Sequence, residues 1–253
     1  MISLLAIETS TEACSVALRT ANGDISRYAE EPRSHTQLLM PMIKSVLSEA
    51  AISVTELNAL SVTIGPGSFT GLRIGFGVTQ GLAYGLDIPV VPVSTLELMV
   101  ATHWRQSLEH YRSNGIAQSA KIVPVIDARM NQFNCGYYEL DTQGHIVNKL
   151  SDRLLGSVEA IHWIEALSPD IIIGDGQGLF SLVKTNQTPK TQIYPHALDL
   201  LNIAQRDIER GAAKAIDSVE LTYLRGADAW QKRKRIKAVA YTHLRAHETR
   251  RYL

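Results

Sequence analysis

The chain has 253 residues, which is long enough to bury a hydrophobic core without disulfides or metal ions, and one or two domains are expected. Hydrophobic residues make up 45% of it and charged residues 20%, a composition that excludes an intrinsically disordered protein. The two cysteines, Cys14 and Cys135, have neither CxxC nor zinc-type spacing, which favours buried thiols in a reducing compartment. The N-terminus shows no secretory leader pattern, and no apolar run reaches the ~18 residues of a membrane span, so a cytoplasmic location is expected.

The formal net charge of zero hides an uneven distribution. From Arg225 to the end there are nine Lys or Arg against two acidic residues, so the preceding 224 residues hold 16 basic and 23 acidic residues, a net charge of −7. A body with this charge repels a phosphate backbone. If the protein acts on nucleic acid, another subunit is expected to hold that nucleic acid.

The first elements along the chain form a pattern that occurs twice. Each copy is an apolar strand ending in an acidic residue, a second strand, a hairpin turn containing glycine and a third strand. The first copy covers residues 4–25 and the second covers 122–146. Cys14, Gly23 and Ile25 each recur 121 positions later. The pattern predicts an internal duplication, with chance similarity of two β-meanders as the alternative.

Helices follow both copies. Apolar residues at helical spacing predict helices over Thr36–Ala50 and Ser157–Leu167, and short buried strands are predicted at Ala59–Ile64, Pro89–Val93 and Asp170–Ile173. A three-strand meander followed by alternating helices and strands, made twice, predicts a duplicated α/β fold with a cleft between its halves.

The join between the halves is expected at residues 113–115. We therefore predict an N-terminal half over 1–113, a C-terminal half over 114–231 and a basic, disordered tail over 232–253. Residues 239–253 continue no periodicity and resemble translated sequencing-adaptor read-through, which suggests that they are not native.

A glycine-rich turn lies between the strand ending at Ile64 and the next helix. Its glycines are Gly65, Gly67 and Gly71, and a turn of this kind leaves backbone N–H groups at a helix N-terminus, where anions bind. The spacing matches neither a Walker loop nor GxGxxG. Ser68 lacks the spacing of a nucleophile elbow, so capping of the helix is the favoured role for it.

The helix after this turn contains three interior glycines, Gly75, Gly77 and Gly81, and is expected to end at Gly85. Each interior glycine costs roughly 1 kcal/mol relative to alanine, about 3 kcal/mol in all. Four-residue spacing allows another backbone to approach closely, either the protein's own sheet or another subunit. For the second alternative we predict an interface formed by Leu38, Leu39, Met42, Ile43, Val46, Leu72, Gly75, Phe76, Thr79 and Gly81.

Four motifs together resemble the TsaB (YeaZ) family. They are Ala6–Thr11, Arg33–His35, Gly65–Gly75 and Thr222–Arg225, and the match covers roughly residues 1–231. The resemblance implies a duplicated actin-like (ASKHA, ribonuclease H-like) fold with two βββα-containing halves. It also implies a non-catalytic subunit that binds TsaD, the enzyme that makes threonylcarbamoyladenosine at position 37 of tRNAs reading ANN codons.

Further partners are implied by the same resemblance. TsaE is expected to join the complex as an ATPase, and TsaC to supply the threonylcarbamoyl-adenylate. The chain is expected to form a homodimer when TsaD is absent, to meet tRNA only indirectly and to have no membrane contact. No cofactor is expected, except that ATP or ADP could lie at the interface of the complex.

The residues themselves support a non-catalytic role. TsaD-type proteins carry His-x-x-x-His after the strand that follows the glycine helix, whereas this chain has Thr95 and Met99 at the two positions. A hydroxyl and a thioether do not replace two imidazoles as metal ligands. We therefore predict no metal site and no catalytic residue.

A degenerate phosphate site is the remaining candidate. Glu8 and Asp127 end equivalent strands at the expected cleft, and turn capping is the favoured alternative to nucleotide binding there. The candidate phosphate-binding residues are Thr9, Ser10, Gly65, Gly67, Ser68, Gly174 and Gly176.

Other motifs point to no specific chemistry. His35 is expected to cap a helix or lie in an interface, and the pair His243 and His247 falls in the suspect tail. The run Lys232–Arg235 could touch tRNA, although a solvated tail is favoured. Two competing functions remain, an ATP-dependent kinase or phosphotransferase and a glycoprotease-like metalloenzyme; no HExxH motif supports the second.

Overall fold

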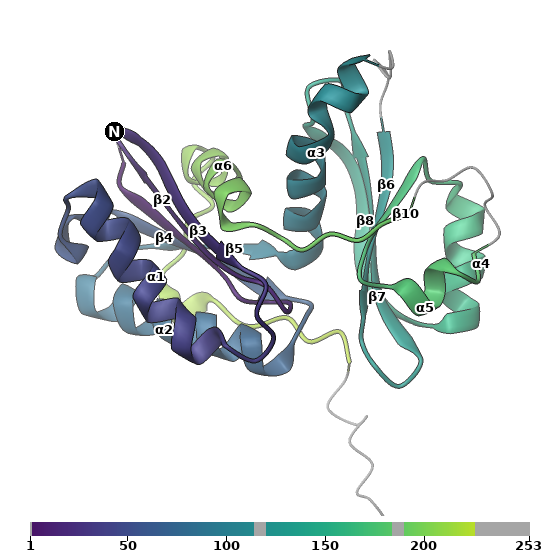
Figure 1. The fold of residues 1–253 in the computed structure, drawn as a ribbon, viewed down its shortest axis with the longest axis horizontal. Coiled ribbons are helices and arrows are strands. Elements are labelled where there is room, and N and C mark those ends of the chain that lie inside the picture. Colours follow the sequence, from purple (N-terminus) through teal and green to yellow (C-terminus); the bar gives the residue numbers. More distant parts are fainter. Residues whose placement is uncertain (1, 114–119, 184–189, 226–253) are drawn as a thin grey trace, which may run out of the picture.

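The structure, a computed structural model, describes residues 2–113, 120–183 and 190–225. Its strands form two five-stranded mixed sheets, each at the centre of one lobe (Figure 1). The first sheet has the order β3-β2-β1-β4-β5 and consists of β1 (Leu4–Glu8), β2 (Cys14–Thr20), β3 (Gly23–Ala29), β4 (Ala59–Gly65) and β5 (Val90–Ser94). The second has the order β10-β9-β6-β7-β8 and consists of β6 (Ala120–Asp127), β7 (Gln132–Leu140), β8 (Ile146–Gly156), β9 (Ile171–Gly174) and β10 (Lys190–Thr191).

The two sheets share one topology, so the predicted duplication is confirmed. In each, three antiparallel strands are followed by two strands parallel to the first. The hairpin glycines Gly23 and Gly144 both have positive φ, which explains why glycine recurs there. The cysteines are not equivalent, because Cys14 begins β2 whereas Cys135 is the fourth residue of β7. The helices and strands predicted after each meander are present with ends within one residue of those expected, whereas the meanders themselves extend further, to Ala29 in the first lobe and from Ala120 to Gly156 in the second.

Helices α1 (His35–Ala50) and α2 (Phe69–Leu86) cover one face of the first sheet. Their inward side chains join those of β1, β2 and β4 in one apolar core. On the second lobe, α4 (Ser157–Leu167) and the short α5 (Gln177–Phe180) cover the outer face. Two 3₁₀ turns, Val54–Glu56 and Ile216–Ser218, complete the described elements.

Two helices lie between the sheets and exchange between the lobes (Figure 1). Helix α3 (Thr95–Ser113) leaves the first sheet and packs against β6, β7 and β9 of the second. Helix α6 (Ala197–Glu209) leaves the second sheet and returns to β1, β2 and β5 of the first. Residues 197–224 therefore lie with the first sheet, although 114–231 was predicted to form the second half. Helix α6 covers the face of the first sheet that α1 and α2 leave open.

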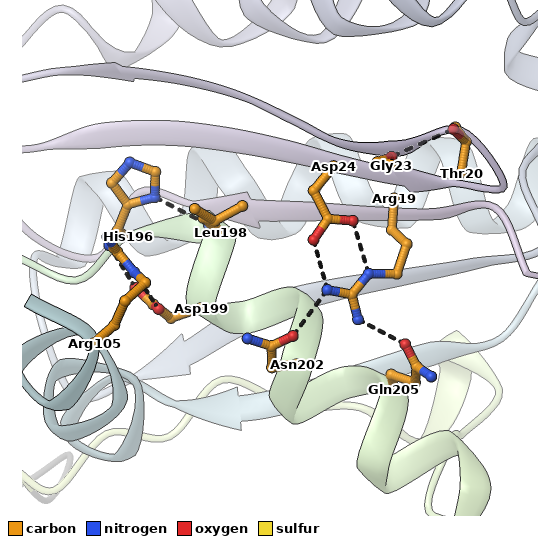
Figure 2. A network of polar contacts seen from close by, with 10 residues as sticks. All are labelled: Arg19, Thr20, Gly23, Asp24, Arg105, His196, Leu198, Asp199, Asn202 and Gln205. Carbon is orange, nitrogen blue, oxygen red and sulfur yellow. Dashed lines mark hydrogen bonds and ion pairs between the residues drawn. The ribbon is translucent and has the colours of Figure 1, made fainter. Parts of the chain in front are cut away.

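Polar contacts hold α6 in this place (Figure 2). Arg19 of β2 donates to Asp24 and also to Asn202 and Gln205 on α6. At the other end of α6, the buried Asp199 accepts two hydrogen bonds from Arg105 of α3, at 2.6 and 2.9 Å. Since α6 is tied both to the first sheet and to α3, it fixes the junction between the lobes. Within the described residues, no helix is both long and apolar enough to cross a membrane.

Candidate functional site

A cleft of about 1030 Å³ lies where the first strands of the two sheets end. The turns after β1 and β6 line it from opposite lobes, together with the β4–α2 turn and the C-terminal segment Thr222–Arg225. The candidate phosphate site was predicted at this cleft. Whether the cleft can bind a phosphate depends on which polar groups of its turns are free to form hydrogen bonds.

The turn after β1 is closed by a carboxyl group of the chain itself. The backbone N–H and the hydroxyl of Ser10 both donate to Oε1 of Glu8, each at 2.5 Å. Glu8 is fully buried, and desolvation raises its pKa to about 7. Its Oε2 and the hydroxyl of Thr63 on β4 are also buried, and the Thr63 hydroxyl lowers the Glu8 pKa against this desolvation. The Ser10 donors that could hold a phosphate are therefore already used.

The glycine turn between β4 and α2 packs against the same segment. A Cβ on Gly67 would lie 2.3 Å from the carbonyl oxygen of Ser10, and one on Gly71 would lie 2.1 Å from that of Thr9. The N–H of Ser68 donates to the Ser10 carbonyl at 2.7 Å, and the Ser68 hydroxyl accepts from Gly71 N at 3.2 Å as the N-cap of α2. These glycines thus allow close packing inside the lobe, which explains their spacing without a ligand.

Gly65 and Thr9 complete this arrangement. Gly65 has φ +112°, and a Cβ on it would lie 2.7 Å from the carbonyl of Thr222. The hydroxyl of Thr9 donates to the carbonyl of Gly71 at 2.8 Å. Gly65 therefore packs closely against the chain's own backbone, and Thr9 forms a hydrogen bond with it.

The second lobe repeats this arrangement. Gly174 has φ +123°, and its Cβ would lie 1.9 Å from the carbonyl of Val125, while a Cβ on Gly176 would meet the Val125 side chain at 2.7 Å. Asp175 between them accepts a hydrogen bond from the N–H of Asp127 at 2.8 Å, and desolvation raises its pKa to about 6. No role is predicted for Asp175 from the sequence, because a carboxylate in an Asp-Gly turn looks like an ordinary turn residue.

The β6–β7 turn holds three consecutive residues in the left-handed region, Arg129, Met130 and Asn131, with φ of 65°, 56° and 59°. This conformation costs a non-glycine residue roughly 1 kcal/mol or more. Arg225 stabilises the turn from the other lobe: its Nη2 donates to the carbonyl of Ala128 at 2.9 Å and to that of Arg129 at 3.2 Å.

Arg225 thereby joins the lobes across the cleft. Its Nη2 also donates to Oε1 of Gln132 at 2.7 Å. The segment that carries it is fixed to the first lobe, since the N–H of Thr222 donates to the carbonyl of Ile64 at 2.8 Å. The sequence signalled Thr222–Arg225 only as a motif and gave no sign of this bridge.

The predicted interface residues fall into two groups, and for the larger group the prediction is wrong. Six are buried in the protein's own core, where no partner can reach them: Leu39, Ile43, Val46, Leu72, Gly75 and Thr79. Leu38, Met42 and Phe76 are half-buried, and Gly81 is exposed. The apolar spacing that suggested docking is the spacing that packs α1 and α2 on their own sheet.

The glycines of α2 also divide by face. A Cβ on Gly75 would lie 2.3 Å from the hydroxyl oxygen of Thr9, so this glycine serves packing within the lobe. Gly77, Gly81 and Gly85 have nothing within 4 Å of an added Cβ. We name these three residues the open glycine stripe.

The two positions that correspond to metal ligands lie in the core. Thr95, the first residue of α3, is fully buried, and Met99 belongs to the apolar core of the second lobe. Among the described residues, no three His, Cys, Asp or Glu side chains gather as a metal site would require. His35 is buried at the start of α1, with Nε2 3.1 Å from the carbonyl of Ala13. His243, His247 and Lys232–Arg235 lie outside the described residues.

Two lobes of one topology, with exchanged helices and a cleft where their first strands end, define the duplicated actin-like (ASKHA) class. A solved Pseudomonas aeruginosa protein, described as uncharacterised with similarity to peptidase YeaZ, has 36% identity and a TM-score of 0.75, covering 89% of this chain and 100% of that one. The solved YeaZ from Pseudomonas aeruginosa has 34% identity and a TM-score of 0.73, with 88% and 100% covered.

Sequence comparison identifies the family. Residues 29–162 match the family model "TsaD: tRNA N6-adenosine threonylcarbamoyltransferase". The tRNA threonylcarbamoyladenosine biosynthesis protein TsaB of Escherichia coli is 36% identical over 236 residues, 90% of this chain and 97% of that protein. The TsaB of Haemophilus influenzae is 31% identical, with 91% and 97% covered. The chain belongs to the TsaB family.

Proposed function

We propose that this protein is a non-catalytic subunit in the formation of threonylcarbamoyladenosine on tRNA, and that it acts by binding TsaD. Its relatives carry the name of that biosynthesis, and a tRNA-modifying role favours a cytoplasmic location. The observation that carries the docking proposal is the open glycine stripe on α2, which offers a partner helix close backbone approach.

The cleft supports the non-catalytic part of the proposal. The donors of Ser10 are bound to Glu8, and the glycines of both turns pack against the first strand of their lobe or the turn that follows it, at Thr9 and Ser10 in one lobe and at Val125 in the other. Thr95 and Met99 lie buried where a metal enzyme of this kind would need two imidazoles. A kinase would need free hydrogen-bond donors facing the cleft to hold phosphate, and a metalloenzyme would need metal ligands there.

The docking face that we propose differs from the one predicted from sequence. It comprises the open glycine stripe, the neighbouring Tyr84 at 59% exposure, and Met40 of α1 at 42% exposure. Helices α1 and α2 pack side by side, so the proposed docking face is formed by two adjacent helices. The exposed apolar side chains offer apolar surface that a partner helix can bury, and the glycine stripe lets the backbone of that helix come close.

We further propose that the same face allows self-association when TsaD is absent. TsaE would then join the complex of this chain with TsaD, and any ATP or ADP would lie at the interface of that complex. In this arrangement tRNA meets TsaD, and the acidic body of this chain contributes no phosphate contacts.

The substitution Gly81→Leu tests the docking face. Nothing lies within 4 Å of the added Cβ, and leucine favours a helix over glycine by roughly 0.8–1 kcal/mol, so the isolated protein should melt no lower than the wild type. Co-elution with TsaD in size-exclusion chromatography should be lost. The matched control is Gly178→Leu, at an exposed glycine with equal space in α5 of the other lobe. Undiminished co-elution of Gly81→Leu would place the docking face elsewhere.

Calorimetric titration of the isolated protein with ATP tests the non-catalytic part. We expect no measurable heat up to millimolar ATP, because the Ser10 donors are occupied. A micromolar dissociation constant would instead favour an ATP-dependent kinase.

A further inference from the structure

An aromatic and cationic cluster lies exposed at the mouth of the cleft, where Phe69 and Arg73 continue the four-residue row of the open glycine stripe to the N-terminal end of α2. Phe69 and Tyr223 are 52% and 46% exposed, with ring centroids 5.7 Å apart. The guanidinium carbon of Arg73 lies 3.5 Å from the centroid of the Phe69 ring, and its Nε donates to the Tyr223 hydroxyl at 3.2 Å. Two large rings are thus held open to solvent by one arginine, which fixes their orientation before any partner binds.

The arginines of this mouth have no acidic partners. Arg33, Arg73 and Arg225 all line the cleft, and none forms an ion pair with a carboxylate within the described residues. Elsewhere in the described chain most arginines are paired, as Arg19 is with Asp24. The terminal nitrogens of Arg73 have no hydrogen-bond partner among the described residues, and their fork matches a carboxylate.

Acidic residues of the cleft offset part of this charge but not all of it. Asp127 pairs with Arg129, and Asp175 is bound to the N–H of Asp127. Glu12 is exposed and lines the cleft, and within the described residues it forms no ion pair. The cleft lining thus holds four arginines, Arg33, Arg73, Arg129 and Arg225, against three carboxylates, a net charge of +1 on a body whose first 224 residues carry a net charge of −7.

We propose that the mouth of the cleft, formed by Arg33, Phe69, Arg73, Tyr223 and Arg225, binds an acidic segment of a protein partner. A carboxylate of that segment binds the terminal nitrogens of Arg73, and an apolar side chain next to it packs on the rings of Phe69 and Tyr223. Exposed aromatic residues and arginine are the residue types that dominate protein interfaces. An acidic segment complements the unpaired arginines of this mouth.

Single-stranded RNA is the competing occupant, because aromatic rings and arginine also stack on bases. RNA needs a track of cations that follows several phosphates, whereas here the unpaired arginines gather at one mouth and the surrounding body is acidic. The small extent of the arginine cluster and the acidic body around it therefore favour an acidic peptide over RNA as the occupant.

Selection from a random 12-residue peptide display library on the immobilised full chain tests this proposal. The enriched sequences should hold several Asp or Glu next to an aromatic or aliphatic residue. In fluorescence anisotropy, the most enriched labelled peptide should bind Arg73→Gln roughly tenfold more weakly than the wild type. Arg73→Lys keeps the charge and loses the fork, so it should fall between the two.

Matched variants separate this site from general electrostatics and from the docking face. Arg210→Gln removes the same charge at an exposed arginine outside the cleft, and Gly81→Leu changes the docking face about two helical turns beyond Arg73 on the same face of α2; both should bind the peptide like the wild type. Melting curves establish that each variant is folded.

Three results would overturn the proposal. The first is enrichment of peptides that are not acidic, or no enrichment at all. The second is an equal loss in Arg210→Gln and Arg73→Gln, which would reveal only non-specific attraction. The third is Arg73-dependent binding of a 12-nucleotide oligoadenylate more tightly than the selected peptide, which would assign the mouth to nucleic acid.

Discussion

At the scale of the residue, Glu8 has the most consequence for what the cleft can do. A carboxyl group at the end of the first strand was expected to face the cleft, yet it is fully buried and accepts both donors of Ser10. Sequence placed Glu8 at the end of its strand because apolar periodicity is local. It could not show the direction of the side chain, which depends on the pairing of β1 with β2 and β4.

Glu8→Gln tests the buried carboxyl group. The folded protein holds this proton up to a pKa of about 7, whereas the unfolded chain releases it near 4.5. The wild type therefore loses stability as pH rises from 4.5 to 7, by an amount on the order of 3 kcal/mol. Glutamine keeps the acceptor for Ser10, has no charge to bury and can donate to the buried hydroxyl of Thr63.

We expect Glu8→Gln to be more stable than the wild type at pH 8 and to differ little at pH 4.5. Urea unfolding at both pH values measures this difference. Asp175 is unchanged in both proteins, so its own raised pKa cancels in the comparison. Parallel pH profiles for the two proteins would show that Glu8 is not buried as described.

At the scale of the element, α2 has two faces with different tasks. The inward glycines Gly71 and Gly75 lie against Thr9, and the outward glycines face open space. The sequence showed four-residue spacing on the helix but could not separate the two sets, because both repeat with the same period. For the same reason the apolar stripe of α1 was assigned to a partner when it belongs to the core.

A matched pair of alanine substitutions on α2 separates the faces. Gly71→Ala places a Cβ 2.1 Å from a backbone oxygen and should lower the free energy of unfolding by about 2 kcal/mol or more. Gly77→Ala meets nothing within 4 Å and should raise it by about 1 kcal/mol through helix propensity. Chemical denaturation measures both, and equal effects on stability would contradict the division of the helix into two faces.

At the scale of the whole molecule, the exchange of α3 and α6 and the Arg225 bridge set the relation of the lobes. The meanders were predicted because hairpin glycines and alternating strands are local signals. The return of α6 to the first sheet was missed, since it depends on contacts between residues such as Arg19 and Gln205, far apart in the chain. The bridge from Arg225 to the β6–β7 turn is equally non-local.

Arg225→Gln tests the bridge. Without the guanidinium, the left-handed turn loses hydrogen bonds to the carbonyls of Ala128 and Arg129. Hydrogen exchange at the amides of this turn should quicken roughly tenfold, while β1 and β4 exchange as before. Arg210→Gln serves as the charge-matched control, and unchanged exchange of the turn in Arg225→Gln would show that the bridge is not formed.

A reconstituted tRNA-modification assay tests most directly whether this chain acts through a partner and not by its own chemistry. Purified TsaD, TsaE and TsaC are combined with tRNA, threonine, bicarbonate and ATP, and modified adenosine is quantified by mass spectrometry. We predict modification with the wild-type chain and with Gly178→Leu, and none with Gly81→Leu or when TsaD is left out. Modified adenosine formed without TsaD, or formed at the wild-type rate with Gly81→Leu, would contradict this account.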